Sequence, residues 1–190
     1  MSNTLNVEIE AVANCNTNKW EPEITGVSVT YQWFTKTLNE IGLTEATTTI
    51  MNEGNYCQMI ADLSQPTNPS QAGAITYYVE SAIYEHEMKH RSDLEGVYNS
   101  KLSSLINDLK NALSIPISAA QNMTEAANTM RSNSAFQWTI TNWHNGVVST
   151  FIGLRESGAQ GVEMQVLNNR ISALNYAALN EQWYQSNMCC

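Results

Sequence analysis

The sequence predicts an α+β fold, in which a small N-terminal β-sheet is followed by a long helix and a C-terminal helical part. Apolar residues alternate with polar ones in the first third of the chain, and they recur at spacings of three and four in the remainder. A parallel sheet would require strands and helices to alternate regularly, and this sequence shows no such alternation. The 190 residues fit one domain, so we expect a single domain over 1–190, mainly strands in 1–66 and mainly helices in 67–190.

A period of two indicates the strands of the first third. Val7, Ile9 and Ala11 alternate with glutamates, and apolar residues alternate with polar ones again over residues 27–33. A short helix is expected over residues 35–41. Residues 56–63 (YCQMIADL) follow a turn-forming stretch and are expected to form a further strand.

The long helix is expected to begin near residue 69, because Asn68 suits the N-cap and Pro69 the first helical position. A stripe of apolar residues at spacings of three and four follows, and Pro116 ends it. Further helices are expected over about residues 119–130 and 167–178. Residues 136–154 fit both the period of a strand and that of a helix.

The charge balance limits the partners of the chain. Nine Lys and Arg stand against eighteen Asp and Glu, which gives a net charge of −9 and an isoelectric point near 4.7. Nucleic acid and anionic membrane surfaces bind clustered basic residues, so this balance excludes nucleic-acid binding as a main role. No run of about 18 apolar residues occurs, so we expect no membrane span.

The N-terminus also bears on location. The first fifteen residues lack the basic and apolar regions of a secretory signal. Charged residues make up only 14% of the chain, which is common in exported proteins. We therefore expect secretion or delivery by a route that needs no signal peptide, with a cytoplasmic location as the alternative.

Four cysteines, Cys15, Cys57, Cys189 and Cys190, allow two disulfides. Their spacing contains no CxxC and no zinc-ribbon pattern. Two alternatives stay open: free thiols, or a C-terminal tail tied by a disulfide to Cys15 or Cys57.

Residues 84–90 (YEHEMKH) contain the pattern HExxH. On a helix, residues four apart lie on the same face, so His86 and His90 offer two imidazoles to one metal ion. Glu87 is placed to reach a metal-bound water without binding the metal. Zinc lowers the pKa of that water to about 7, and a carboxylate then takes its proton as the water attacks a carbonyl carbon.

With this motif on a long helix, the sequence resembles the zincin class of metallopeptidases. It is similar to bacterial predicted zinc proteases in which a small β-rich N-terminal part precedes HExxH. The resemblance is specific over five residues and topological over roughly residues 5–113. It implies that residues 56–63 form the strand before the active-site helix. It also implies that His86 and His90 bind Zn²⁺ and that Glu87 is the general base.

A catalytic zinc site needs a third protein ligand, and several residues compete for this role. The metzincin extension HExxHxxGxxH is absent, because residue 96 is Gly. His144, the third His of the chain, has apolar neighbours and is one candidate. Asp93, three residues after His90, is another, either as a ligand or as a group that orients a ligand imidazole. The remaining candidates are distant carboxylates that no spacing argument separates: Glu125, Glu156 and Glu163.

These observations favour a zinc-dependent hydrolase that cleaves peptide bonds in a protein or peptide substrate. Two alternatives remain. One is a non-enzymatic helical interaction or structural module with an accidental or degenerate HExxH. The other is a structural metal site in which protein fills all four positions.

Overall fold

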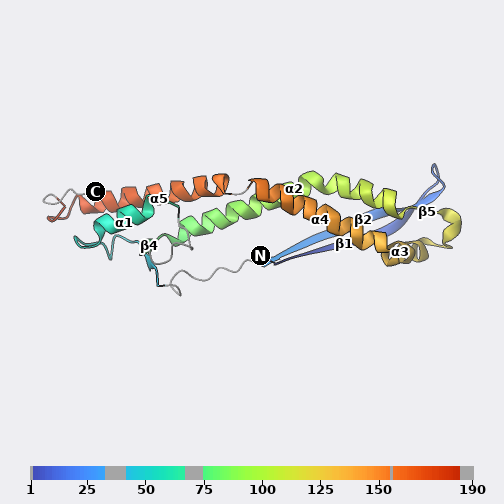
Figure 1. Cartoon of the computed structure of the whole chain (residues 1–190), viewed down its shortest axis with the longest axis horizontal. Coiled ribbons are helices and arrows are strands. Elements are labelled where there is room, and N and C mark those ends of the chain that lie inside the picture. Colours follow the sequence, from blue (N-terminus) through green and yellow to red (C-terminus); the bar gives the residue numbers. More distant parts are fainter. Residues whose placement is uncertain (1, 33–41, 67–74, 155, 185–190) are drawn as a thin grey trace. The chain divides into compact units, whose positions relative to one another are not determined.

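A computed structural model describes residues 2–32, 42–66, 75–154 and 156–184 (Figure 1). An N-terminal antiparallel β-sheet is followed by several helices, which confirms the predicted α+β class. The chain divides into two compact units, Met1–Phe34 with Leu94–Gly153 and Thr35–Asp93 with Leu154–Cys190. The single domain expected from the chain length stays a prediction.

The sheet of the first unit consists of a long hairpin and a short third strand. β1 (Ser2–Asn14) pairs antiparallel with β2 (Lys19–Gln32), and β5 (Ile115–Pro116) pairs with the start of β2. Apolar side chains of β1 are buried at every second position from Val7 to Ala11, and the glutamates between them are exposed. The predicted alternation of this strand is therefore confirmed.

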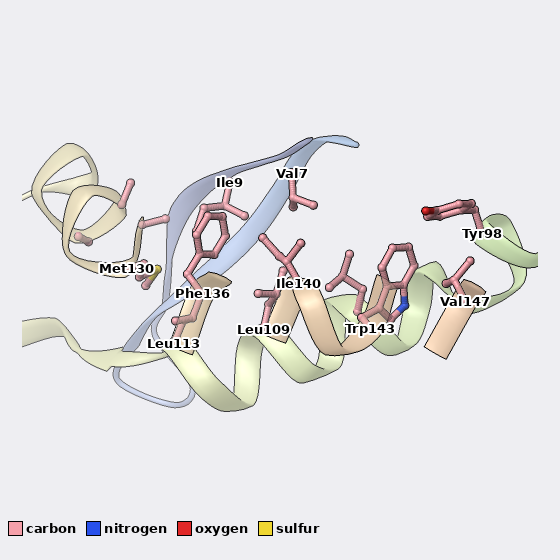
Figure 2. Packing of buried hydrophobic residues seen from close by; sticks show 14 of the residues in the cluster. Val7, Ile9, Tyr98, Leu109, Leu113, Met130, Phe136, Ile140, Trp143 and Val147 are labelled. Atoms are coloured by element: carbon pink, nitrogen blue, oxygen red, sulfur yellow. The ribbon is translucent and has the colours of Figure 1, made fainter. Parts of the chain in front are cut away.

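The core of the first unit lies between this hairpin and three helices (Figure 2). The helices are the second part of α2 (Glu80–Leu113), α3 (Met123–Ser132) and α4 (Ser134–Leu154). Figure 2 shows Val7 and Ile9 of β1 together with Leu109 of α2 and with Phe136 and Ile140 of α4. The short 3-10 helix η3 (Ile117–Ala119) links α2 and β5 to α3.

α4 shows which of two periods governs residues 136–154. Ile140, Trp143, Val147 and Phe151 are buried at spacings of three and four, which is the period of a helix. In a strand, Trp138 and Ile140 would share one face, but Trp138 is 68% exposed while Ile140 is buried. The segment is therefore helical along its whole length.

The second unit is built from α1 (Tyr56–Leu63), the first part of α2, α5 (Ser157–Ala178) and a two-stranded parallel sheet. The sheet pairs β3 (Thr44–Glu45) with β4 (Tyr77–Tyr78). One apolar cluster joins α1, α2 and α5 through Met59, Leu63, Ala82, Leu167 and Leu174. α5 is thereby packed beside the part of α2 that carries HExxH.

Residues 56–63 form helix α1, so the prediction of a strand there is wrong. Tyr56, Met59 and Leu63 are buried at spacings of three and four, which is the period of a helix. An apolar run of this length does not by itself distinguish a buried strand from a helix. Tyr56 also packs against Trp183, with 5.5 Å between the ring centroids.

α2 begins at Glu80 rather than near residue 69. The expected N-cap and first position, Asn68 and Pro69, lie outside the described residues, as does the short helix expected over 35–41. Just before α2 the chain is extended in β4, where Asp62 Oδ2 accepts the backbone N–H groups of Thr76 (2.8 Å) and Tyr77 (2.9 Å).

Three of the described helices exceed twenty residues: α2 with 34, α4 with 21 and α5 with 22. Among the helices described, none combines enough length with enough apolar character to cross a membrane.

The cysteines differ in state. Cys57 is disulfide-bonded, whereas Cys15 is a free and exposed thiol. Cys189 and Cys190 lie outside the described residues.

Candidate metal centre

α2 places both histidines of HExxH on one of its faces. The Nε2 atoms of His86 and His90 lie 3.0 Å apart, and the two rings are inclined by 78°. His90 is 9% exposed and His86 is half-buried. Two ring nitrogens therefore converge on one point, as residues four apart on a helix allow.

α5 supplies a buried carboxylate to the first of these histidines. Glu163 is 1% exposed, and its Oε2 lies 2.9 Å from Nδ1 of His86. Burying an unpaired carboxylate costs several kcal/mol, so the donor at this position matters to the fold. Because a carboxylate only accepts, Nδ1 of His86 carries the hydrogen and donates it. The lone pair of His86 Nε2 is then directed towards His90, in the arrangement by which carboxylates orient metal-binding histidines.

The start of α5 brings a second carboxylate to the pair. One ligand atom from each of His86, His90 and Glu156 lies within 4.8 Å of the other two. Glu156 is exposed at the N-cap of α5 and has φ 80° and ψ −64°. This conformation is strained for a residue other than glycine, at a cost of about 1–3 kcal/mol, and such strain concentrates at functional sites. Glu163 follows about two helical turns later, so α5 presents both carboxylates on the same side.

Glu87 follows His86 directly on α2 and is half-buried. Within the described part of the chain, no hydrogen bond or ion pair engages its carboxylate. Among the described residues, Glu87 is therefore a carboxylate without a fixed partner, next in sequence to a histidine of the three-residue group.

Asp93 lies near the group but is bound to a different partner. It forms an ion pair with Lys89 one turn earlier on α2. A Cβ atom at Gly158, near the start of α5, would lie 3.7 Å from Lys89 Nζ and 3.9 Å from Asp93 Oδ2. The ion pair therefore packs beside the start of α5, and the group of possible ligands does not include Asp93.

His144 belongs to α4 of the first unit, whereas His86 and His90 belong to the second. Its Nδ1 lies 2.5 Å from the hydroxyl of Tyr98. Burial lowers the pKa of His144 below its usual value, so the ring is neutral at pH 7 and Nδ1 accepts the hydroxyl hydrogen. Glu125 also lies in the first unit, where its Oε2 accepts the N–H of Gln121 at the start of α3.

From the sequence, Glu156 and Glu163 are candidates for the third zinc ligand, but nothing there distinguishes them from Glu125. Glu163 lies seven residues after Glu156, the N-cap of α5, and this spacing was the signal that could have selected them, because positions seven apart share a helix face. The packing of α5 beside α2, which brings that face to the histidines, is a property of the tertiary structure.

The geometry of the site is the basis for a functional conclusion, since relatives provide none. Family models, curated proteins and solved structures were all compared with the chain, and none of them matches it. The resemblance to zincins stays a prediction.

Proposed function

We propose that the chain is a zinc-dependent peptidase in which His86, His90 and Glu156 bind Zn²⁺ and Glu87 is the general base. One observation carries the proposal. The Nε2 atoms of the two histidines lie 3.0 Å apart, and a carboxylate oxygen of Glu156 lies within 4.8 Å of a ring nitrogen of each.

The donor set fits zinc in kind and in number. Two imidazole nitrogens and one carboxylate, with a fourth position open, form a common catalytic zinc site. Tetrahedral zinc bonds of about 2.0–2.1 Å hold two ligand atoms about 3.3 Å apart. The two Nε2 atoms therefore need to separate by only about 0.3 Å. The side chain of Glu156 is exposed and has room to approach.

Glu163 has a positioning role in this proposal. Its hydrogen bond to Nδ1 fixes the ring and the tautomer of His86. In the metal-free site the hydrogen between the two Nε2 atoms belongs to His90, because Nδ1 of His86 already carries one. For both rings to hold Zn²⁺ through Nε2, this hydrogen would move to Nδ1 of His90, which leaves the ring neutral.

The reaction assigned to these residues is hydrolysis of an amide. Zinc, when bound, polarises a carbonyl group and makes water a nucleophile near neutral pH. Glu87 accepts the proton of the attacking water and then donates it to the leaving amine. Glu163 keeps His86 in place throughout, because its buried carboxylate accepts the Nδ1 hydrogen of the ring.

Zinc content and hydrolysis test the proposal together. Protein purified without a His tag is expected to hold one zinc per chain, by elemental mass spectrometry, in the wild type and in Glu87→Gln. His86→Ala and Glu156→Ala should lose it. Peptide hydrolysis should fall by about 100-fold or more in Glu87→Gln, because general bases contribute about 10²–10⁴-fold.

Two matched variants assign the third ligand. Asp93→Asn and His144→Ala remove the competing candidates and should retain zinc. Zinc that persists in Glu156→Ala would contradict its role as a ligand. A wild type without zinc after reconstitution would contradict the enzyme. Unfolding on chelation, with no hydrolysis by any variant, would assign a structural metal site instead.

The state of Cys57 supports the expected export. Disulfides form and persist in oxidising compartments and are rare in the cytosol. Since Cys57 is disulfide-bonded, we infer that the chain functions outside the cytosol. Thiol labelling of protein isolated from its native source tests this, because a fully reduced Cys57 would contradict it.

A further inference from the structure

α4 has two opposite faces of different character. One face is buried in the core of the first unit and carries Phe136, Ile140, Trp143 and Val147 (Figure 2). On the opposite face, Trp138, Asn145 and Ile152 recur every seven residues, so they form one row along the helix. Trp138 is 68% exposed and Ile152 is 49% exposed. This outer row is therefore apolar at both ends and polar in the middle.

The exposure of Trp138 is costly for a surface that meets only water. Trp is highly buried on average in folded proteins, and it is enriched among the few residues that supply most of the binding energy of protein interfaces. Ile152 presents a second apolar side chain on the same row, about 21 Å further along the helix. The outer row thus has the kind of residues that bind another protein.

α4 is also uncharged in a strongly acidic chain. Its 21 residues include no Asp, Glu, Lys or Arg, whereas the 34 residues of α2 include ten. Burial lowers the pKa of His144, so this ring is neutral at pH 7 as well. The outer face of the hairpin, by contrast, carries the four glutamates Glu8, Glu10, Glu21 and Glu23.

This distribution of charge favours a second copy of the chain as the partner at α4. Two copies with a net charge of −9 each repel one another wherever their carboxylates meet. Within the described parts of the first unit, α4 is a face on which two copies can meet without that repulsion.

The order of residues along the outer row suits a two-fold axis. Trp138 and Ile152 are each seven residues, or about 10.5 Å, from Asn145. In an antiparallel pair of α4 helices with Asn145 on the axis, each Trp138 lies opposite Ile152 of the second copy. The two Asn145 amides can then donate and accept hydrogen bonds between them, in the way that one Asn sets the register of a coiled coil.

An antiparallel pair also fits better than a parallel one. It places one Trp138 and one Ile152 at each end of the contact, so the two helices keep the same separation along their length. A parallel pair would place two tryptophans at one end and two isoleucines at the other. The antiparallel arrangement brings opposite ends of the two helix dipoles together as well.

We propose that the chain forms a homodimer through the outer rows of two antiparallel α4 helices, with Asn145 on the two-fold axis. Such an interface uses the same surface on both copies, as the commonest protein dimers do. It is about 31 Å long, the length of α4, and lies at the small end of specific interfaces, so we expect a dissociation constant in the micromolar range. The proposal does not depend on the metal centre, whose possible ligands lie in the second unit.

Sedimentation equilibrium of the whole chain, over a concentration series that spans the micromolar range, tests the interface. Removing one interface residue of this kind weakens binding by about 30-fold, and the dimer contains two. Trp138→Ala should therefore raise the dimer dissociation constant by about 100-fold or more. Met123→Ala is the matched control, because Met123 is 55% exposed on α3 of the same unit, and it should leave the constant unchanged. Circular dichroism should show the same fold in both variants.

A pair of charge variants tests the antiparallel register. Trp138→Lys and Ile152→Glu should each be monomeric alone, because each places a charge opposite an apolar side chain. An equimolar mixture of the two should form dimers, because Lys at position 138 then meets Glu at position 152 and the other end keeps its native contact. In a parallel pair these two positions never meet. A monomeric wild type, a dimer that Trp138→Ala leaves unchanged, or a mixture that stays monomeric would overturn the proposal.

Discussion

The two units bury different kinds of side chain. In the first unit the buried cluster is apolar, and Thr139 is the buried polar residue among those described. In the second unit the apolar clusters are smaller, and Asp62, His90 and Glu163 are buried with them. An apolar group of the same volume often stabilises a fold more than a buried charged group does. Buried acids in the second unit therefore call for a reason other than stability.

The two buried acids of the second unit are buried for different reasons. Asp62 accepts two backbone N–H groups just before α2 and one side-chain N–H from Gln58, so it is explained by local structure. Glu163 instead binds the ring of His86, whose second nitrogen faces His90. The first unit is thus organised around packing, and the second around a polar centre, which agrees with a functional site in the second unit.

The largest expected effect is on the stability of the first unit. Phe136 is 6% exposed in its core, and Phe136→Ala should lower the free energy of unfolding by about 3–5 kcal/mol because it leaves a cavity. Zinc stoichiometry should not change. Chemical denaturation followed by circular dichroism measures the loss. Trp138→Ala, on the same helix but 68% exposed, should cost less than about 0.5 kcal/mol. Equal losses in the two variants would contradict the packing described here.

A smaller effect is expected on metal affinity in the second unit. Glu163→Gln keeps an oxygen that accepts the Nδ1 hydrogen of His86 but removes the negative charge. We expect the zinc dissociation constant to rise about 10- to 100-fold, as for other groups that orient metal-binding histidines. Competition with a chelator of known affinity measures it, and Glu181→Gln should leave it unchanged. An unaltered constant in Glu163→Gln would assign Glu163 to the fold alone.

The smallest expected effect is a gain in the stability of the metal-free protein, whereas most substitutions lower the stability of a protein. Glu156→Gly relieves the strain of a positive φ, at about 1–3 kcal/mol, but makes the unfolded chain more flexible, at about 0.5–1 kcal/mol. The metal-free protein should therefore become more stable by about 1 kcal/mol. Stabilisation by added zinc should disappear. Thermal unfolding with and without zinc shows both results.

Asn18 offers the matched control for this prediction in the first unit. It also has a positive φ, 55°, at the turn between β1 and β2. Asn tolerates this conformation better than Glu, so Asn18→Gly should change stability less. It should keep the full response to zinc. A loss of zinc stabilisation in Asn18→Gly would break the division of roles between the units.

The periods of the sequence predicted the first unit better than the second. The alternation around Val7 and Ile9 and the helical stripe of α4 both rest on long apolar patterns, which a packed core reproduces directly. The strand expected over residues 56–63 is wrong because an apolar run of eight residues does not by itself distinguish a buried strand from a helix. The role of Asp62 depends on Thr76 and Tyr77, which the pattern of α1 does not contain.

The residues of the candidate site also differ in whether they could be predicted from the sequence. The pair His86 and His90 was accessible from the sequence because it depends on one helix and a spacing of four. Glu156 and Glu163 lie far along the chain on another helix, and only the packing of α5 beside α2 brings them to the histidines. The strained φ of Glu156 cannot be predicted from the sequence, since Glu is not a residue that favours a positive φ.

The contact between Tyr56 and Trp183 has a consequence for measurements of tryptophan fluorescence. Of the five tryptophans, only Trp183 falls within the second unit. Indole emission recorded during unfolding is therefore dominated by the first unit, and a metal-dependent transition of the second would add only a small part of the amplitude. Replacing the other four tryptophans by phenylalanine would leave Trp183, packed near Tyr56, as the single reporter of the unit that holds the histidines.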